Sequence, residues 1–116
     1  MFRFEELDIW KLAIEYADKV YDLANKLPAD EKYNLIIQLK KATLSISNNI
    51  AEGSGTATSR NFSSFLDISV ASAFETINLL HFAKIRRYIT EEEKQVLYQK
   101  AEILVKRIRA FKNSLK

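Results

Sequence analysis

Apolar side chains recur along most of this chain at spacings that alternate between three and four residues. The first such stripe comprises Trp10, Ala13, Ala17, Val20, Ala24 and Leu27. Residues at this spacing lie on one face of an α-helix, so the pattern predicts an amphipathic helix over about residues 5–26. Pro28 interrupts the stripe, and the Pro28-Ala29-Asp30 stretch is typical of the start of another helix.

The same periodicity predicts three further helices, over about residues 30–52, 59–87 and 91–114. Thr90 and Glu93 have the spacing of a capping box at the start of the last one. No segment shows the alternation of a β-strand. Four helices joined by short turns predict an all-α fold, an up-down-up-down four-helix bundle in a single domain over residues 1–116.

The third predicted helix is apolar nearly all round, which a lone four-helix bundle does not explain. A helix with this pattern is buried on nearly every side, so we expect it and the second helix to face another subunit as well. The alternative is a lone bundle with an irregular core. The residues expected at the contact between subunits are Ile37, Leu44, Phe65, Ile68, Leu79 and Phe82.

Composition and charge narrow the class of protein. The chain has 116 residues, of which 47% are hydrophobic and 28% charged, and it has no cysteine. It shows neither a signal-peptide pattern nor an apolar run long enough for a membrane span, so we expect a cytoplasmic protein with no membrane partner. From Lys84 onward, ten Lys and Arg residues stand against four Glu, although the whole chain carries only +3. This asymmetry favours an anionic partner for the carboxyl-terminal third.

Both glycines lie in the stretch Glu52-Gly53-Ser54-Gly55, which raises the question of a phosphate-binding loop. A Walker-type loop has four residues between its glycines, a Lys after the second one and a strand before the first. None of these features is present here. The stretch is therefore interpreted as a corner between helices, with Gly53 just past a helix end in the left-handed conformation and Thr58 or Ser59 as the next cap.

No catalytic or metal-binding pattern emerges. His81 is the only histidine, and Asp67 and Asn78 near it on the same helix make no recognisable set, so a surface or interface position is expected. The carboxylates of Glu91–Glu93 suit the positive end of a helix, which accounts for them without Mg²⁺. No serine has a histidine or lysine arranged to activate it. We expect no enzymatic activity, no cofactor and no metal.

Several basic residues are candidates for phosphate contacts. They are Lys106, Arg107 and Arg109 near the end of the last helix, and a second group formed by Lys40, Lys41 and Arg60. Cations beside phosphates release counterions and give salt-dependent affinity, whereas the alternative is an ordinary solvated surface. Tyr88 and Tyr98 could stack on bases or pack within the bundle. Glu52 and Glu75 are interpreted as structural polar contacts, with Lys41 as a possible partner.

The order and spacing of several motifs resemble one known family. They begin with Phe4, Leu7, Trp10 and Ala13, continue with Gln38-Leu39-Lys40-Lys41-Ala42 and Asn49-Ile50-Ala51-Glu52-Gly53, and end with Phe62, Phe65-Leu66, Ala71-Ser72 and Glu75. The chain resembles the short bacterial four-helix-bundle proteins that are encoded in intervening sequences of large-subunit rRNA genes, some of which are labelled as ribosomal proteins. The resemblance covers nearly the whole chain.

The resemblance implies a ring of bundles, most simply a homopentamer. The relatives include accessory proteins of diversity-generating retroelements, which bind nucleic acid and a reverse transcriptase. The recurrent polar positions of the family correspond here to Lys40, Lys41, Asn49, Glu52 and Glu75. The chain departs from the family at Thr56 and Ala57, where basic residues are usual. This loss of positive charge weakens the case for phosphate binding by the turn between the second and third helices.

Two functions remain open at this stage. One is an oligomeric accessory protein that binds RNA or another nucleic acid through clustered Lys and Arg residues. The other is a scaffold for protein–protein interaction whose basic surface is incidental. The absence of a pocket motif with convergent titratable groups argues against an enzyme in either case.

Overall fold

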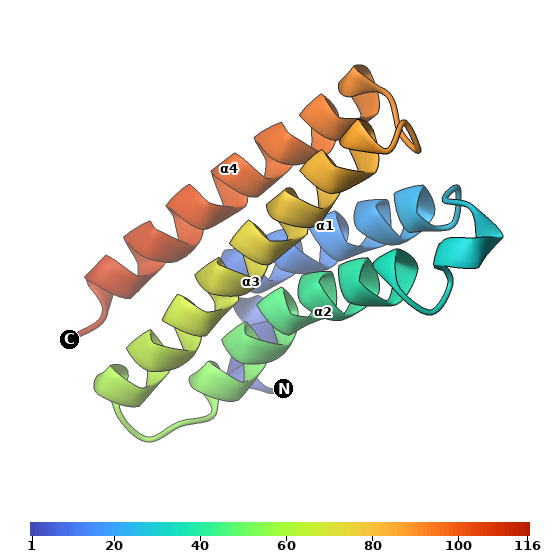
Figure 1. The fold of residues 1–116 in the computed structure, drawn as a ribbon. Coiled ribbons are helices and arrows are strands. Elements are labelled where there is room, and N and C mark those ends of the chain that lie inside the picture. Colours follow the sequence, from blue (N-terminus) through green and yellow to red (C-terminus); the bar gives the residue numbers. More distant parts are fainter.

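The computed structural model describes residues 1–116 as an elongated bundle of 45 × 24 × 21 Å. It contains four α-helices and two short 3₁₀ turns: 3₁₀ Arg3–Glu6, α1 Asp8–Ala24, 3₁₀ Ala29–Glu31, α2 Leu35–Ser54, α3 Ser59–Ile85 and α4 Glu91–Ser114. Helix α1 packs against α2 and α4, and α3 packs against the same two helices (Figure 1). The predicted all-α four-helix bundle is confirmed.

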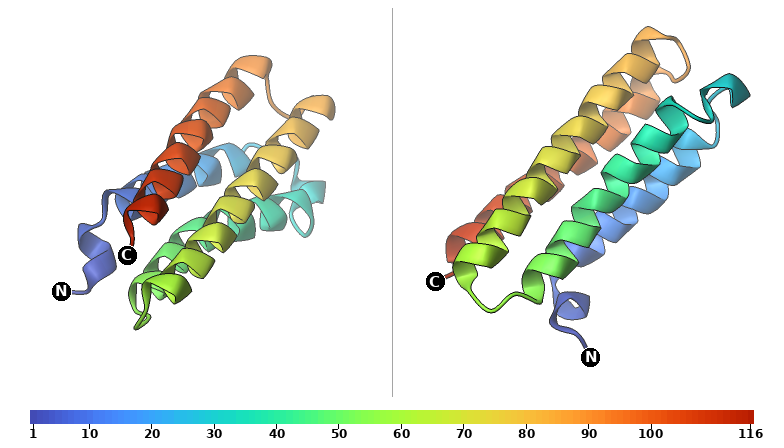
Figure 2. Two further views of the ribbon diagram at one scale, coloured as in Figure 1. Left: turned by 90° about the vertical axis from the view of Figure 1, so that its left-hand side faces the viewer. Right: turned by 60° about the horizontal axis from the view of Figure 1, so that its bottom comes forward.

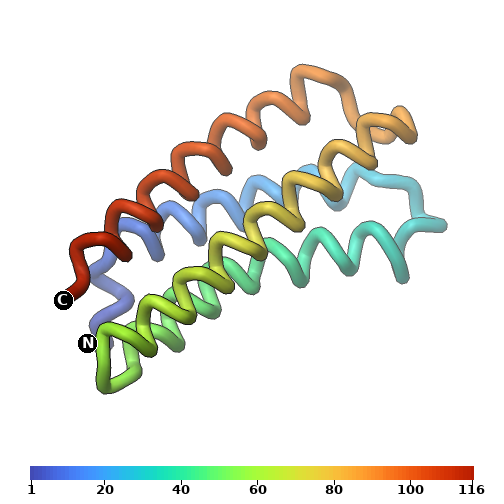
Figure 3. The backbone as a smooth tube through the Cα atoms, turned by 60° about the vertical axis from the view of Figure 1, so that its left-hand side comes forward, coloured from blue at the N-terminus to red at the C-terminus, as the bar shows by residue number.

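The direction of the chain alternates from helix to helix, so both termini lie at one end of the bundle (Figures 2 and 3). The turn between α2 and α3 lies at the same end, and the turns before α2 and before α4 lie at the opposite end. None of the helices combines the length and the apolar character that a membrane span requires.

Side-chain caps fix where α3 and α4 begin. The Thr58 hydroxyl accepts a hydrogen bond from the backbone N–H of Asn61 at 3.1 Å, so Thr58 rather than Ser59 is the cap of α3. The backbone N–H of Glu93 donates to the Thr90 hydroxyl at 3.1 Å, and the Thr90 N–H donates to the Glu93 carboxylate at 2.9 Å. The predicted capping box is confirmed, and both ends of α4 coincide with the predicted range.

Helix α2 begins at Leu35, five residues later than the pattern indicated. The stretch that follows Pro28 forms a separate 3₁₀ turn and not the first turn of the helix. Leu35 is the first buried residue after Leu27, so no buried apolar side chain between them would stabilise a longer helix.

The interpretation of Gly53 was wrong. Gly53 lies inside α2 and no glycine has a positive φ angle, so it is not a left-handed helix end. Its role is steric, because a Cβ atom at this position would lie 2.8 Å from Cδ1 of Phe62 and 2.8 Å from Cβ of Phe65. Gly53 therefore lets α2 and α3 approach closely at this end of the bundle.

Small polar residues continue this close contact along the two helices. The Ser69 hydroxyl donates to the backbone carbonyl of Ile46 at 2.6 Å, and the hydroxyls of Ser45 and Ser72 are 2.7 Å apart. These short side chains keep the backbones close and satisfy their own polar atoms, and the α2–α3 pair makes the most extensive contact in the bundle.

Candidate nucleic-acid interface

Three basic side chains near the end of α4 point into solvent without a carboxylate partner. Lys106, Arg107 and Arg109 are exposed, and none of them takes part in the ion pairs of the chain, which involve other lysines. Lys106 and Arg109 line a groove between α3 and α4. Arg107 follows Lys106 directly, so it projects from α4 in a direction that differs by about 100°. The three charges therefore wrap around the end of α4 instead of forming one flat patch.

The second predicted basic group, Lys40, Lys41 and Arg60, is not brought together. Lys40 is half-buried, donates to the side-chain carbonyl of Asn25 at 3.2 Å and lies 4.9 Å from the centre of the Tyr21 ring. It belongs to the contact between α1 and α2. Lys41 is exposed on α2, and its distance from the α2 end nearest Arg60 is about 20 Å along the helix axis.

The groove between α3 and α4 has a volume of about 340 Å³ and an aromatic wall. His81 from α3 and Tyr98 from α4 meet edge to face, with ring centres 5.9 Å apart. The Arg109 guanidinium lies 5.7 Å from the centre of the Phe74 ring. A neighbouring depression over Val70 shares Phe74 and Arg109 with this groove, so the two form one continuous trough.

The two tyrosines singled out in the sequence have different surroundings. Tyr98 lines this groove, whereas the Tyr88 hydroxyl donates to the Glu31 carboxylate at 2.9 Å and ties the 3₁₀ turn before α2 to the turn after α3. His81 packs on Tyr98 and forms no set with Asp67, whose carboxylate binds Lys112 at 2.7 Å. No group of three or more His, Asp or Glu side chains lies close enough to hold a metal ion.

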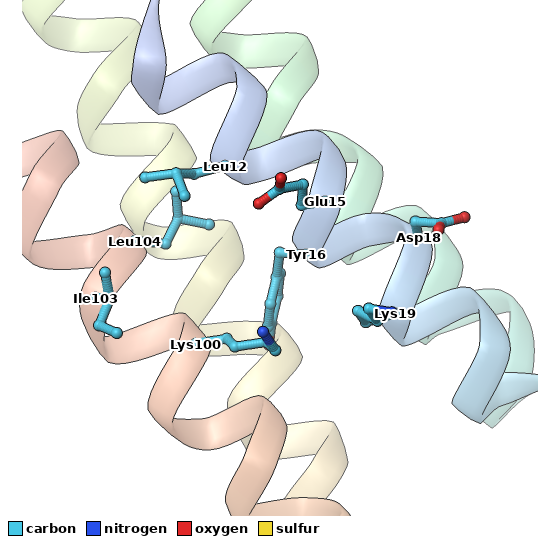
Figure 4. Close-up of a pocket in the computed structure, with 8 residues that line it drawn as sticks. All are labelled: Leu12, Glu15, Tyr16, Asp18, Lys19, Lys100, Ile103 and Leu104. Atoms are coloured by element: carbon cyan, nitrogen blue, oxygen red, sulfur yellow. The ribbon is translucent and has the colours of Figure 1, made fainter.

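A larger groove of about 470 Å³ separates α1 from α4 (Figure 4). The Tyr16 side chain lines it and is only 2% exposed, its hydroxyl has no hydrogen-bond partner, and burial raises the pKa of the phenol. Glu15 and Lys19 from α1 and Lys100 from α4 also line this groove. Tyr16 was not among the predicted residues, although its place three residues after the buried Ala13 indicates that it faces the core.

The predicted structural polar residues behave differently from one another. The Asn49 side chain donates to the backbone carbonyl of Ser45 at 2.7 Å and to its hydroxyl at 3.0 Å, so it makes a structural contact within α2. Glu52 and Glu75 are exposed, their carboxylates make no hydrogen bond or ion pair in this chain, and Lys41 is not their partner.

The residues expected at a subunit contact are also divided. Leu79 is only 8% exposed and belongs to the core of the chain itself, so it does not fit that expectation. Ile68 is 50% exposed and Phe82 is 47% exposed. We use the name outer α2–α3 face for the five residues with solvent-accessible side chains: Ile37, Leu44, Phe65, Ile68 and Phe82.

The fold and these surfaces define an all-α protein, a four-helix bundle with unpaired cations around the end of α4. A family model defines the class of protein more narrowly. The model matches residues 5–110, and the chain belongs to the 23S rRNA-intervening sequence protein family. No curated protein sequence matches the chain.

A solved structure has the same fold. It is that of a protein of unknown function from the S23 ribosomal protein family of Bacteroides thetaiotaomicron, to which this chain is similar with a TM-score of 0.83 and 21% identity. The alignment covers 91% of this chain and 99% of the other. At this level of identity the likeness establishes the fold alone.

Proposed function

We propose that this protein is a non-enzymatic, self-assembling helical bundle that binds nucleic acid in the cytoplasm. The observation that carries the proposal is the set of unpaired cations Lys106, Arg107 and Arg109 on less than two turns of α4. An exposed cation without a carboxylate neighbour keeps its full charge for a phosphate, and its displaced counterions drive association. Arg60 is a further contact of the same kind.

RNA is the nucleic acid to test first. The family name links its members to sequences that intervene in 23S rRNA, which makes a structured RNA the natural probe. The resemblance to retroelement accessory proteins adds a protein partner, such as a reverse transcriptase, as a second binding partner.

Self-assembly would compensate for the small number of cations on one bundle. The outer α2–α3 face exposes large apolar side chains, and we propose that it packs against other copies in a ring, most simply a pentamer. A ring presents the α4 cations several times, so that weak contacts on one RNA act together through a high effective concentration.

The test is fluorescence anisotropy of a labelled structured RNA over a series of salt concentrations. The variant carries Lys106→Ala, Arg107→Ala and Arg109→Ala. A matched control with the same loss of charge carries Lys11→Ala, Lys19→Ala and Lys32→Ala, all at exposed positions without ion pairs. Each lost phosphate contact is expected to lower the slope of log K against log salt by about 0.7 to 0.9.

Two outcomes would count against the proposal. If the wild-type protein binds no RNA even at low salt, nucleic-acid binding is excluded. If both triple variants lose affinity equally, net charge is responsible and the α4 cations have no special role.

The alternative is a scaffold for protein–protein interaction, which the exposed Ile68 and Phe82 favour. Light scattering combined with the absorbance ratio of the purified protein separates the two functions. A stable oligomer that carries no nucleic acid and binds none would support the scaffold.

A further inference from the structure

The trough between α3 and α4 presents three flat rings, two from α3 and one from α4. Phe74 and His81 are seven residues apart, which places them on the same side of α3 and about 10 Å apart along its axis. Tyr98 faces His81 from α4. Bases stacked at about 3.4 Å per nucleotide cross this distance in about three nucleotides. The distance between the two rings therefore suits about three stacked nucleotides of a single nucleic-acid strand.

Phe74 is the least expected of these rings, because it is 54% exposed although it is large and apolar. The bundle has no structural need for an aromatic ring that remains half in water. An exposed ring can stack on any base, since every base has a flat face, and stacking of this kind is common in proteins that bind single strands.

Two cations lie beside the rings, where the sugar–phosphate backbone of a bound nucleic acid would pass. Lys106 and Arg109 line the trough and are free of ion pairs, and the Arg109 guanidinium already lies over the Phe74 ring at 5.7 Å. Two acidic residues line the trough: Glu102, which has no salt bridge to either cation, and Asp67, which pairs with Lys112 instead. A second copy of this chain covering Phe74 would have to place carboxylates against both cations, whereas the phosphates of a nucleic acid pair with them directly.

We propose that the trough between α3 and α4 binds single-stranded nucleic acid. Phe74, His81 and Tyr98 stack on unpaired bases, while Lys106 and Arg109 hold the adjoining phosphates. A double helix offers no free base faces along its length, so the rings select loops, bulges and single strands. This inference rests on the proposed function and adds the class of nucleic acid and the residues that select it.

The experiment compares a labelled twelve-nucleotide single-stranded RNA with a duplex of the same sequence. The variants are Phe74→Leu and Tyr98→Leu, which keep apolar volume but remove the ring. Tyr33→Leu is the control for loss of an exposed ring, because Tyr33 is an exposed tyrosine beside Lys32 that lies in the turn before α2 and outside the trough. Each groove variant is expected to weaken single-strand binding by about 5- to 100-fold with an unchanged salt slope, whereas the control is neutral. Phe74→Tyr restores the ring and is expected to retain affinity.

The outcomes separate this inference from the proposed function. If wild-type protein binds structured RNA but binds the duplex as tightly as the single strand, or if both leucine variants bind like the wild type, the trough has no such role and general RNA binding survives. If Phe74→Leu changes the oligomeric state in light scattering, the trough is a contact between copies and the inference fails. If no nucleic acid binds at all, both fail together. Circular dichroism of each variant confirms that the fold is intact.

Discussion

Replacing Gly53 with alanine would place a methyl group in the closest part of the contact between α2 and α3. The added Cβ would lie 2.8 Å from Cδ1 of Phe62 and 2.8 Å from Cβ of Phe65, against 3.4–4 Å for ordinary contact. The gap must therefore widen by at least about 0.6 Å. The Cβ of Phe65 is fixed to the backbone of α3, so the clash with this atom can be relieved only if α3 itself moves. The Phe62 ring is buried and packs edge to face on Phe111, with ring centres 5.5 Å apart, so it cannot swing away freely.

The magnitude follows from two opposing effects. Overpacking of a well-filled core costs about 1–3 kcal/mol. Alanine is better than glycine inside a helix by about 0.5–1 kcal/mol, which offsets part of that cost. We expect a net loss of about 1–2 kcal/mol in the free energy of unfolding. With an unfolding entropy of about 2.1 cal/mol/K per residue, this lowers the melting temperature by about 4–8 °C.

The assay is thermal and urea unfolding followed by circular dichroism, at one protein concentration because association shifts apparent stability. Gly55→Ala is the control. Its Cβ would meet nothing closer than the Glu52 carbonyl oxygen at 3.5 Å, and its φ of −89° suits alanine. The control should be neutral or slightly stabilising. If Gly53→Ala is as stable as Gly55→Ala, the close approach of α2 and α3 is not the reason for Gly53.

Three other changes test local features. Tyr16→Phe removes a buried hydroxyl without a partner, so the free energy of unfolding should rise by about 1 kcal/mol, and a decrease would mean that the hydroxyl is hydrogen-bonded. Arg87 has a φ of 64°, so Arg87→Gly should stabilise by about 1 kcal/mol in urea unfolding, whereas Arg86→Gly, at a right-handed position, should not. The pKa of Glu93 is lowered, chiefly by the hydrogen bond from the Thr90 backbone, so its carboxylate stabilises the fold above its ordinary pKa of about 4.3 and this stabilisation is lost as the pH falls further. The stability advantage of wild type over Glu93→Gln should therefore shrink between pH 7 and pH 3, and a constant difference would contradict the assignment.

Features that depend on one helix at a time were predictable from the sequence. The capping box of Thr90 and Glu93 is formed by residues three apart in the sequence. The bounds of α4 coincide with the predicted range because its start signal and its apolar stripe both lie within its own sequence. The bundle itself follows from four such stripes joined by short turns. The late start of α2 at Leu35 was missed because the Pro28 start signal also suits a separate 3₁₀ turn.

Features that depend on how two helices meet were not predictable in the same way. The helix-end interpretation of Gly53 used only its neighbours in sequence, but the reason for the glycine lies on α3. Leu79 has the same direction as Ile68 on the helical wheel, yet it is buried within the chain. Lys40 counts as a free cation in the sequence, whereas Tyr21 and Asn25 engage it in the structure. The spacing of Phe74 and His81 can be read from the sequence, but the trough that they line forms only because α4 packs beside α3.

The two proposed surfaces use different sides of α3 and are compatible in one assembly. Ile68 and Phe82 of the outer α2–α3 face point away from Phe74 and His81 of the trough by about 100° around the helix axis. Close packing through Gly53 holds α2 and α3 together as one unit, so a contact through their outer face need not disturb the trough on the α4 side. A ring built through that face would leave one trough open on every subunit. A long RNA could then engage several troughs at once, whereas a short strand fills only one. The dependence of affinity on RNA length is therefore as informative about the mode of binding as its dependence on salt concentration.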